Sequence, residues 1–220
     1  MSERTLSQAV YEELRARILD GRLPAGEPIR ERDLAAELQV SRVPIREALG
    51  PLELAGLISV SPRRTAVVTT VTRRDVDELY DIRSALEPLV ARTAAAAIRT
   101  GEDPTPLLAV VEAAGAALDA GDLASFHLES GRVHGAIEAL AGNRLFITTM
   151  GPLNERSNRL NVANAKSEPD IRHDEHVRLV DAVATGNVRL AESAAHSHVE
   201  WGRRRTLATL SSVPGFVEVN

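Results

Sequence analysis

The chain has 220 residues, of which 44 % are hydrophobic, 3 % aromatic and 26 % charged, and its formal net charge is −5. These values are typical of a soluble globular protein with an aliphatic core, and the length allows one large domain or two of about 100 residues. The absence of cysteine excludes disulfides, thiolate metal sites and thiol nucleophiles. Since there is no apolar run of about 18 residues and no apolar signal-peptide core, we expect a cytoplasmic protein with no membrane partner.

The charge is unevenly distributed along the chain. Residues 1–72 contain 10 Arg and 10 acidic residues and are therefore neutral. Residues 73–220 contain 15 Arg and one Lys against 21 acidic residues, and they hold all six His. The acidic total argues against a nucleic-acid-binding protein, but the neutral N-terminal part can still carry a basic face.

Three short helices are expected before residue 55. Residues 5–20 are predicted to form the first, because apolar side chains recur every four positions. These side chains are Leu6, Val10, Leu14 and Ile18. A second helix starts near residue 31, and a third runs from an N-cap at Ser41, with Pro44 in its first turn, to about Leu54.

Two short strands, residues 58–60 and 66–68, are expected to flank a basic turn at residues 61–65. Three helices followed by a two-stranded ribbon outline a winged helix-turn-helix, a fold that places its recognition helix in the major groove of DNA. We therefore predict a DNA-binding domain over residues 1–71.

The arginines of this domain are candidates for DNA contact. Arg42 and Arg46 are four residues apart and so lie on one face of the third helix. Arg63 and Arg64 occupy the ribbon tip, from which they would reach the DNA backbone or minor groove. Charge alone leaves open the alternative that these arginines form a solvated helix face.

The amino-acid sequence of this segment closely resembles that of the GntR family of bacterial transcription regulators over about residues 8–68. The motifs that carry the resemblance are LPAGEPI at 23–29, ERDLA at 31–35, VSRVPIREAL at 40–49, LE at 52–53 and GLI at 56–58. With the helix that begins at Ser41, the resemblance implies that operator DNA is contacted by Arg32, Ser41, Arg42, Val43, Arg46, Arg63 and Arg64. Two residues depart from the family pattern. Pro51 would kink or shorten the recognition helix, and Thr65 replaces the usual glycine of the ribbon turn.

Residues 72–220 are predicted to form an all-α helical bundle, which makes the fold mainly α. Strand-like alternation is not convincing anywhere in this part, and Gly or Pro residues separate six helical stretches. The expected helices span about 73–98, 106–120, 122–141, 145–165, 170–185 and 188–210. Gly151 and Pro152 would kink or break the fourth of them.

Three histidines are expected on the inward faces of three of these helices. His176 lies ten residues before Gly186 and His198 twelve after it, so the two lie at similar heights in a helical hairpin. His134 lies on the inward face of an earlier helix. Three imidazoles that meet in a bundle core can bind one divalent metal ion. The alternative for each is a hydrogen-bonded core histidine.

The second part resembles the ligand-binding FCD domain of the FadR-type branch of the GntR family over about residues 72–210. The resemblance rests on Arg83 with LEP at 86–88, AGN at 141–143, EH at 175–176 and HV at 198–199. Many members of that branch bind Zn²⁺ or a similar ion through one Asp and three His. The histidines match His134, His176 and His198, but the Asp position is Ser130, so water or an effector oxygen would complete the shell.

The resemblance also implies a small organic acid as effector. The family holds such an acid with an Arg near the start of the first helix of the FCD domain, and Arg83 matches that residue. Ser130, near the metal, is a second candidate effector contact. The alternative for Arg83 is an ion pair with Glu87, four residues further along the helix.

The predicted function is a ligand-responsive DNA-binding transcriptional regulator, a repressor that acts as a homodimer on operator DNA. The alternative is a metal-dependent hydrolytic enzyme, because three His with an open coordination position also describe a catalytic zinc site. Against the enzyme, the sequence has no HExxH, GxSxG or phosphate-loop motif. An architectural DNA-binding protein without a sensor would not need the inward histidines.

Overall fold

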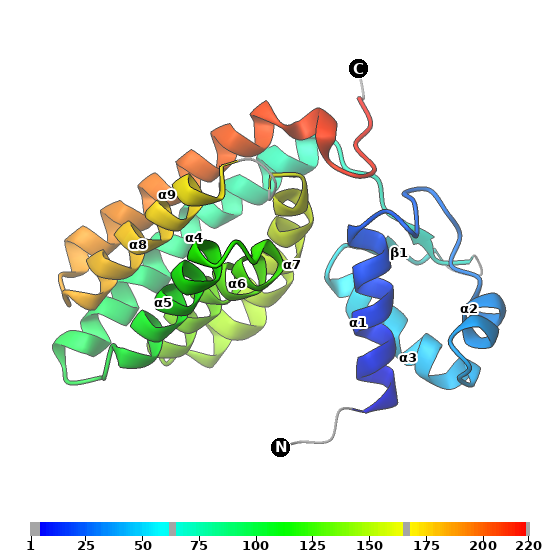
Figure 1. Cartoon of the computed structure of the whole chain (residues 1–220), viewed down its shortest axis with the longest axis horizontal. Helices are drawn as coiled ribbons and strands as arrows, with labels where there is room; N and C mark the ends of the chain where they lie inside the picture. Colours follow the sequence, from blue (N-terminus) through cyan, green and yellow to red (C-terminus); the bar gives the residue numbers. More distant parts are fainter. Residues whose placement is uncertain (1–4, 62–64, 165–167, 219–220) are drawn as a thin grey trace. The chain divides into compact units, whose positions relative to one another are not determined.

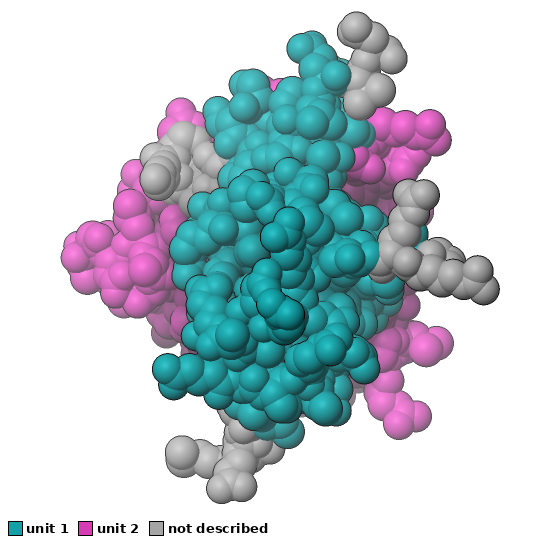
Figure 2. Space-filling view, turned by 90° about the vertical axis from the view of Figure 1, so that its right-hand side faces the viewer, with its two compact units in different colours: residues 1–73, 155–163, 210–220 teal, residues 74–154, 164–209 magenta. Residues whose placement is uncertain are grey.

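The computed structural model describes residues 5–61, 65–164 and 168–218 (Figure 1). The described chain is mainly helical with one two-stranded sheet, which confirms the predicted fold class. It divides into two compact units, residues 1–73 with 155–163 and 210–220, and residues 74–154 with 164–209 (Figure 2). The domain boundary expected between residues 71 and 72 stays a prediction.

The first unit contains the predicted three helices and ribbon. Its elements are α1 (Leu6–Leu19), α2 (Glu31–Glu37), α3 (Arg42–Leu54), β1 (Ile58–Ser59) and β2 (Val67–Val68). The strands are antiparallel, with Ile58 opposite Val68. The ribbon-tip residues Arg63 and Arg64 lie outside the described residues, and Thr65 is exposed at their border, so the effect of Thr65 on the tip stays a prediction.

The core of the first unit is aliphatic. Leu14 and Ile18 of α1 pack with Ile45 and Leu52 of α3, and all four are almost completely buried. Leu6, which we expected on the buried stripe, is 57 % exposed. It is the first residue of α1 and precedes the first buried turn of that helix.

Two expectations for α3 differ from the structure. Ser41 has the extended backbone of an N-cap, but its side chain makes no cap hydrogen bond. Pro51 does not shorten the helix, which continues to Leu54. Proline removes only the hydrogen bond of its own nitrogen, and the buried Leu52 that follows it holds the last turn against the core.

The second unit contains the six predicted helices. They are α4 (Arg73–Arg99), α5 (Thr105–Asp119), α6 (Leu123–Leu140), α7 (Arg144–Asn164), α8 (Pro169–Ala184) and α9 (Val188–Ala208), of which α7 also contributes residues 155–163 to the first unit. Pro152 does not break α7, which is one helix on both sides of it. Among all the described residues, no helix is long and apolar enough to cross a membrane.

The hairpin of α8 and α9 sets the position of two of the three histidines. The two helices lie side by side (Figure 1), and the turn between them contains Gly186 with a φ of 69°. Glycine adopts this left-handed conformation without the steric cost of a side chain. The turn therefore fixes the register at which His176 on α8 and His198 on α9 meet inside the bundle.

Candidate functional site

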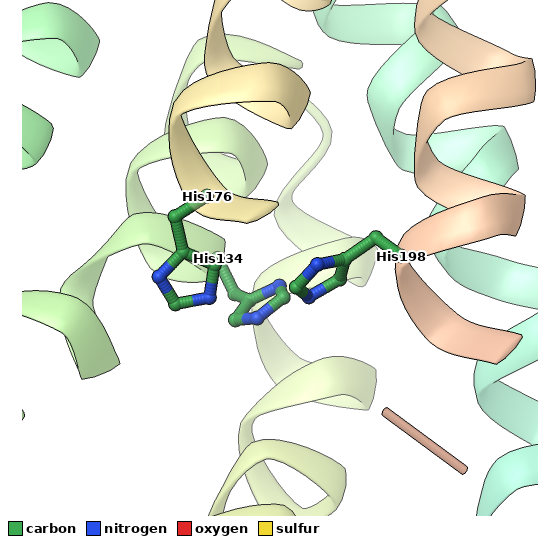
Figure 3. A group of neighbouring side chains, drawn as sticks. All are labelled: His134, His176 and His198. Atoms are coloured by element: carbon green, nitrogen blue, oxygen red, sulfur yellow. The ribbon is translucent and has the colours of Figure 1, made fainter. Parts of the chain in front are cut away.

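Three histidines from three helices converge inside the second unit, and we call them the histidine cluster (Figure 3). They are His134 on α6, His176 on α8 and His198 on α9. The ring centroids lie 5.5 Å apart for His134 and His176, and 5.2 Å apart for each of the other two pairs. One ring nitrogen of each histidine lies within 4.8 Å of the others, a spacing that suits a shared metal ion.

The three imidazoles are neutral at pH 7. Burial lowers the pKa of all three below the ordinary histidine value, and it does so most clearly for His176 and His198. Burial and the neighbouring His134 bring the pKa of His198 to about 3. Neutral imidazole is the form that binds a metal ion, so the cluster needs no deprotonation before binding.

Two observations, one hydrogen bond and one buried nitrogen without a hydrogen-bond partner, test whether the cluster fits a metal ion. Ser130, one turn before His134 on α6, has its Oγ 3.1 Å from Nδ1 of His176. That hydrogen bond orients the ring and leaves Nε2 of His176 for a ligand. Nδ1 of His198 is buried and has no hydrogen-bond partner among the described residues. A buried polar atom without a partner is costly, and an ion would satisfy it. The residues present therefore fit a metal ion better than they fit three hydrogen-bonded core histidines.

The buried ion pair of Arg83 and Glu87 lies on α4 beside the cluster. Arg83 Nε donates a hydrogen bond to Glu87 Oε1, and both side chains are almost completely buried. The other oxygen, Glu87 Oε2, lies 3.6 Å from His134 Nδ1 and has no hydrogen-bond partner. Burial raises the pKa of Glu87, but attraction to Arg83, and then to His134 and His198, lowers it to about 2. Glu87 is therefore a carboxylate at neutral pH.

Arg83 thus forms the ion pair with Glu87 that was the alternative to effector binding in the sequence analysis. An acid effector that reached Arg83 would have to share its guanidinium with Glu87. Next to the cluster is a small pocket that includes Glu87, His134 and Glu138 in its lining. It has room for about one water molecule, so an organic acid would need the helices around it to move apart.

Arg172, one turn before His176 on α8, was not identified from the sequence. It makes no ion pair with any described residue. Burial, followed by repulsion from Arg205 and Arg83, lowers the pKa of Arg172 to about 10. The four-residue spacing of Arg172 and His176 indicates that both lie on one face of α8. The sequence does not show that this spacing places Arg172 near other arginines.

Trp201 on α9 lies against the cluster, and Tyr80 on α4 lies against the same helix. The ring of Trp201 lies 6.4 Å from the ring of His198 in a stacked arrangement. Tyr80 on α4 is buried, and its hydroxyl is 2.9 Å from Thr206 Oγ1. The contact between Tyr80 and Thr206 joins α4 to α9, and Trp201 covers His198 from within α9.

Four of the candidate DNA-binding residues, Arg32, Arg42, Val43 and Arg46, lie exposed on α2 and α3. Nη2 of Arg42 and Nη2 of Arg46 each donate a hydrogen bond to Oε2 of Glu31, at 3.1 and 3.0 Å. Val43 lies between the two arginines in sequence and is 61 % exposed. Arg32 is highly exposed, with its nearest carboxylate, that of Asp33, 3.9 Å away. The structure thus brings Arg42 and Arg46 together at Glu31, a residue whose role the sequence did not indicate.

Two family comparisons cover most of the chain. Residues 6–68 match the family described as bacterial regulatory proteins, gntR family, and residues 78–200 match the FCD domain. The first is a class of bacterial regulators that bind DNA through a helix-turn-helix. The chain belongs to this GntR family, in the branch with an FCD domain, as the sequence motifs indicated.

Known relatives agree with this assignment. A probable D-xylose utilization operon transcriptional repressor of Paenarthrobacter nicotinovorans is 30 % identical over 200 residues, which cover 90 % of this chain and 88 % of that protein. The gluconate operon transcriptional repressor of Bacillus licheniformis is 44 % identical over 78 residues, covering 36 % of this chain and 32 % of that one.

Solved structures share the fold. Escherichia coli McbR/YncC superposes with a TM-score of 0.75 at 21 % identity, covering 94 % of this chain and 99 % of that one. A putative transcriptional regulator GntR from Rhodococcus sp. RHA1 has a TM-score of 0.72 at 22 % identity, and the match covers 92 % of this chain and 97 % of that one.

Proposed function

We propose that this GntR-family regulator is a ligand-responsive repressor that binds operator DNA as a homodimer, and that a small organic acid at the histidine cluster controls this binding. The observation that carries the proposal is the convergence of His134, His176 and His198 beside Arg83. A regulator with no ligand would gain nothing from three neutral, partly unsatisfied imidazoles in its core.

His134, His176 and His198 would hold a divalent metal ion, and three imidazole nitrogens suit Zn²⁺. When bound, the ion supplies a positive charge that attracts a carboxylate. Ser130 keeps the ring of His176 in its binding orientation through the Oγ to Nδ1 contact. Arg83 would bind the acid through charge-assisted hydrogen bonds.

The charge around the cluster favours an anion. Arg172 has no carboxylate partner among the described residues, and it is repelled by Arg205 and Arg83. An organic acid would relieve this repulsion, so its binding energy would increase with each guanidinium that it approaches. Because the neighbouring pocket is small, acid binding would move the helices that carry these groups.

The DNA-binding surface would be the exposed side of α3. Arg42 and Arg46 lie beside an exposed Val43, and this combination suits a major groove, in which arginine reads guanine and an apolar side chain contacts the thymine methyl group. Arg32, Ser41 and the tip residues Arg63 and Arg64 would add contacts to the backbone or groove. A solvated face would not need an exposed valine between two arginines.

A homodimer would present two such surfaces to the two halves of a palindromic site, which gives an affinity that one small domain lacks. We place the protein in the cytoplasm, where operator DNA is found, and we assign it no enzymatic role. The hydrolase alternative is not favoured, because the xylose and gluconate operon relatives are transcriptional repressors.

Fluorescence anisotropy with the DNA upstream of the protein's own gene tests this proposal. Chelator-treated and Zn²⁺-loaded protein would be titrated with labelled DNA in the presence of a panel of small carboxylic acids. We expect at least one acid to change the DNA affinity of the Zn²⁺-loaded protein, and a chelator to reduce that change. A shuffled DNA of the same composition is the control. Equal affinity for both DNAs would contradict a sequence-specific regulator.

A further inference from the structure

The histidine cluster provides no negative charge of its own. A divalent ion bound by three neutral imidazoles keeps its full charge of about +2, and Arg83 adds a positive charge nearby. An uncompensated charge inside a helical bundle carries a large desolvation cost. Ser130, on α6, offers only a hydroxyl, and this hydroxyl is bonded to His176. Ser130 therefore supplies no compensating charge, and a carboxylate of the protein that does so has to be a different side chain.

Glu87 on α4 is the carboxylate that faces the cluster. Its side chain is 6 % exposed, and its Oε1 accepts the hydrogen bond of Arg83. Its Oε2 is the only carboxylate oxygen in the described residues that is buried without a hydrogen-bond partner. Glu138, also buried in the bundle, differs in accepting a hydrogen bond from Asn154 at 2.8 Å. Glu129 pairs with Arg132.

The distance from Glu87 to the cluster is that of a second metal ligand rather than of a hydrogen bond. Glu87 Oε2 lies 3.6 Å from His134 Nδ1, which is too long for a hydrogen bond between these atoms. Two donors bound to one tetrahedral ion at about 2.1 Å each lie about 3.4 Å apart. The observed separation therefore leaves the space that an ion between the two atoms requires.

We infer that Glu87 is the anionic ligand of the metal centre: its Oε2 faces His134 and would turn onto the ion that His134, His176 and His198 hold. The inference rests on the metal ion in the proposed function. Arg83 is then a positioning residue for the ion, because it holds Oε1 and turns Oε2 toward the cluster. An acid that draws the guanidinium of Arg83 away from Glu87 would also change the ligand field of the metal.

Titration with Co²⁺ tests the role of Glu87, because the visible spectrum of this ion depends on its ligands. Full-length, untagged, chelator-treated protein would be titrated with Co²⁺, and Zn²⁺ affinity would be measured by competition. We expect Glu87→Gln to weaken the binding of both ions at least tenfold and to change the Co²⁺ spectrum. Glu129→Gln removes a carboxylate of the same bundle that is paired with Arg132 on α6, and it is the matched control, with wild-type affinity and spectrum expected.

Rescue separates a ligand from a residue that only supports the fold. In the double variant Glu87→Gln/Ser130→Asp, a new carboxylate reaches the cluster from α6, and we expect at least half of the lost affinity, on a logarithmic scale, to return. No recovery in a folded double variant would overturn the inference. If Glu87→Gln does not fold, the crystal structure of the Zn²⁺-loaded wild type decides. Glu87 Oε2 at about 2.1 Å from the ion supports the inference, and a separation above about 3 Å overturns it.

The outcomes also separate this inference from the proposed function. Wild-type protein that binds neither Co²⁺ nor Zn²⁺ would overturn both the metal centre and the role of Glu87. Wild-type and Glu87→Gln proteins with equal affinity and identical spectra would overturn only the role of Glu87. The metal centre at the three histidines would then stand.

Discussion

Replacement of Arg46 by alanine should separate DNA recognition from stability. The Arg46 side chain is 65 % exposed, and its hydrogen-bond partner is Glu31, which Arg42 also binds. An exposed ion pair contributes about 0–1 kcal/mol to folding, and Arg42 still neutralises Glu31 in the variant. We therefore expect the free energy of unfolding of Arg46→Ala to fall by less than about 1 kcal/mol.

The loss in DNA binding should be larger. An arginine that reads a base edge contributes about 1–3 kcal/mol, which corresponds to an affinity about 5- to 150-fold lower for the cognate site. The affinity for unrelated DNA should fall much less, so that specificity is lost with affinity. Fluorescence anisotropy at one fixed salt concentration measures both, and urea unfolding of the same preparation measures stability.

Arg74→Ala is the matched control for this experiment. Arg74 is also an exposed arginine in an ion pair, with Glu78 on α4, but it lies outside the helix-turn-helix. We expect it to bind cognate DNA within about twofold of the wild type. If Arg46→Ala bound the cognate site as tightly as Arg74→Ala does, α3 would not be the recognition helix.

Three further predictions follow from the geometry. Glu31→Gln removes the negative charge that binds Arg42 and Arg46. The affinity of this variant for DNA of any sequence should therefore rise about two- to fivefold in the anisotropy assay. A decrease would contradict the idea that Glu31 competes with DNA for the two arginines. Metal-free protein should lose stability between pH 7 and pH 5, because the unfolded chain protonates His198 near pH 6.5 whereas the folded chain does so only near pH 3. This one histidine accounts for about 2 kcal/mol, so urea unfolding at the two pH values should show a smaller difference for His198→Asn than for the wild type. Light scattering at micromolar concentration should give the mass of a dimer, about twice 23.7 kDa, and a monomer that protects a single half-site would refute the dimer.

The helices were predictable because their signals are local. Four-residue apolar spacing marked α1, and glycines marked the ends of the bundle helices within a few residues. The approach of His176 and His198 was also predictable by counting residues on both sides of Gly186. Because each helical residue adds the same rise, residues at similar counts from the turn lie at the same level along the two helices. Pro51 and Pro152 misled the prediction because their effect depends on how firmly the neighbouring residues pack.

The electrostatic arrangement of the site was not predictable to the same degree. The spacing of Arg83 and Glu87 indicates that they pair, but it does not indicate that the second oxygen of Glu87 faces His134 on another helix. That orientation depends on the rotation of α4 against α6. In the same way, the crowding of Arg172 with Arg205 depends on how α8 and α9 pack. Such contacts between helices have no signature in either sequence segment alone.

The stacking of Trp201 on His198 provides the protein with its own optical reporter. Trp201 is the single tryptophan of the chain, and its indole lies 6.4 Å from the imidazole of His198. The emission of an indole changes when a neighbouring imidazole gains a proton or binds an ion. Unlabelled protein can therefore be followed in a fluorimeter while ions or acids are added, and the signal comes from a half-buried indole beside His198 without interference from a second indole.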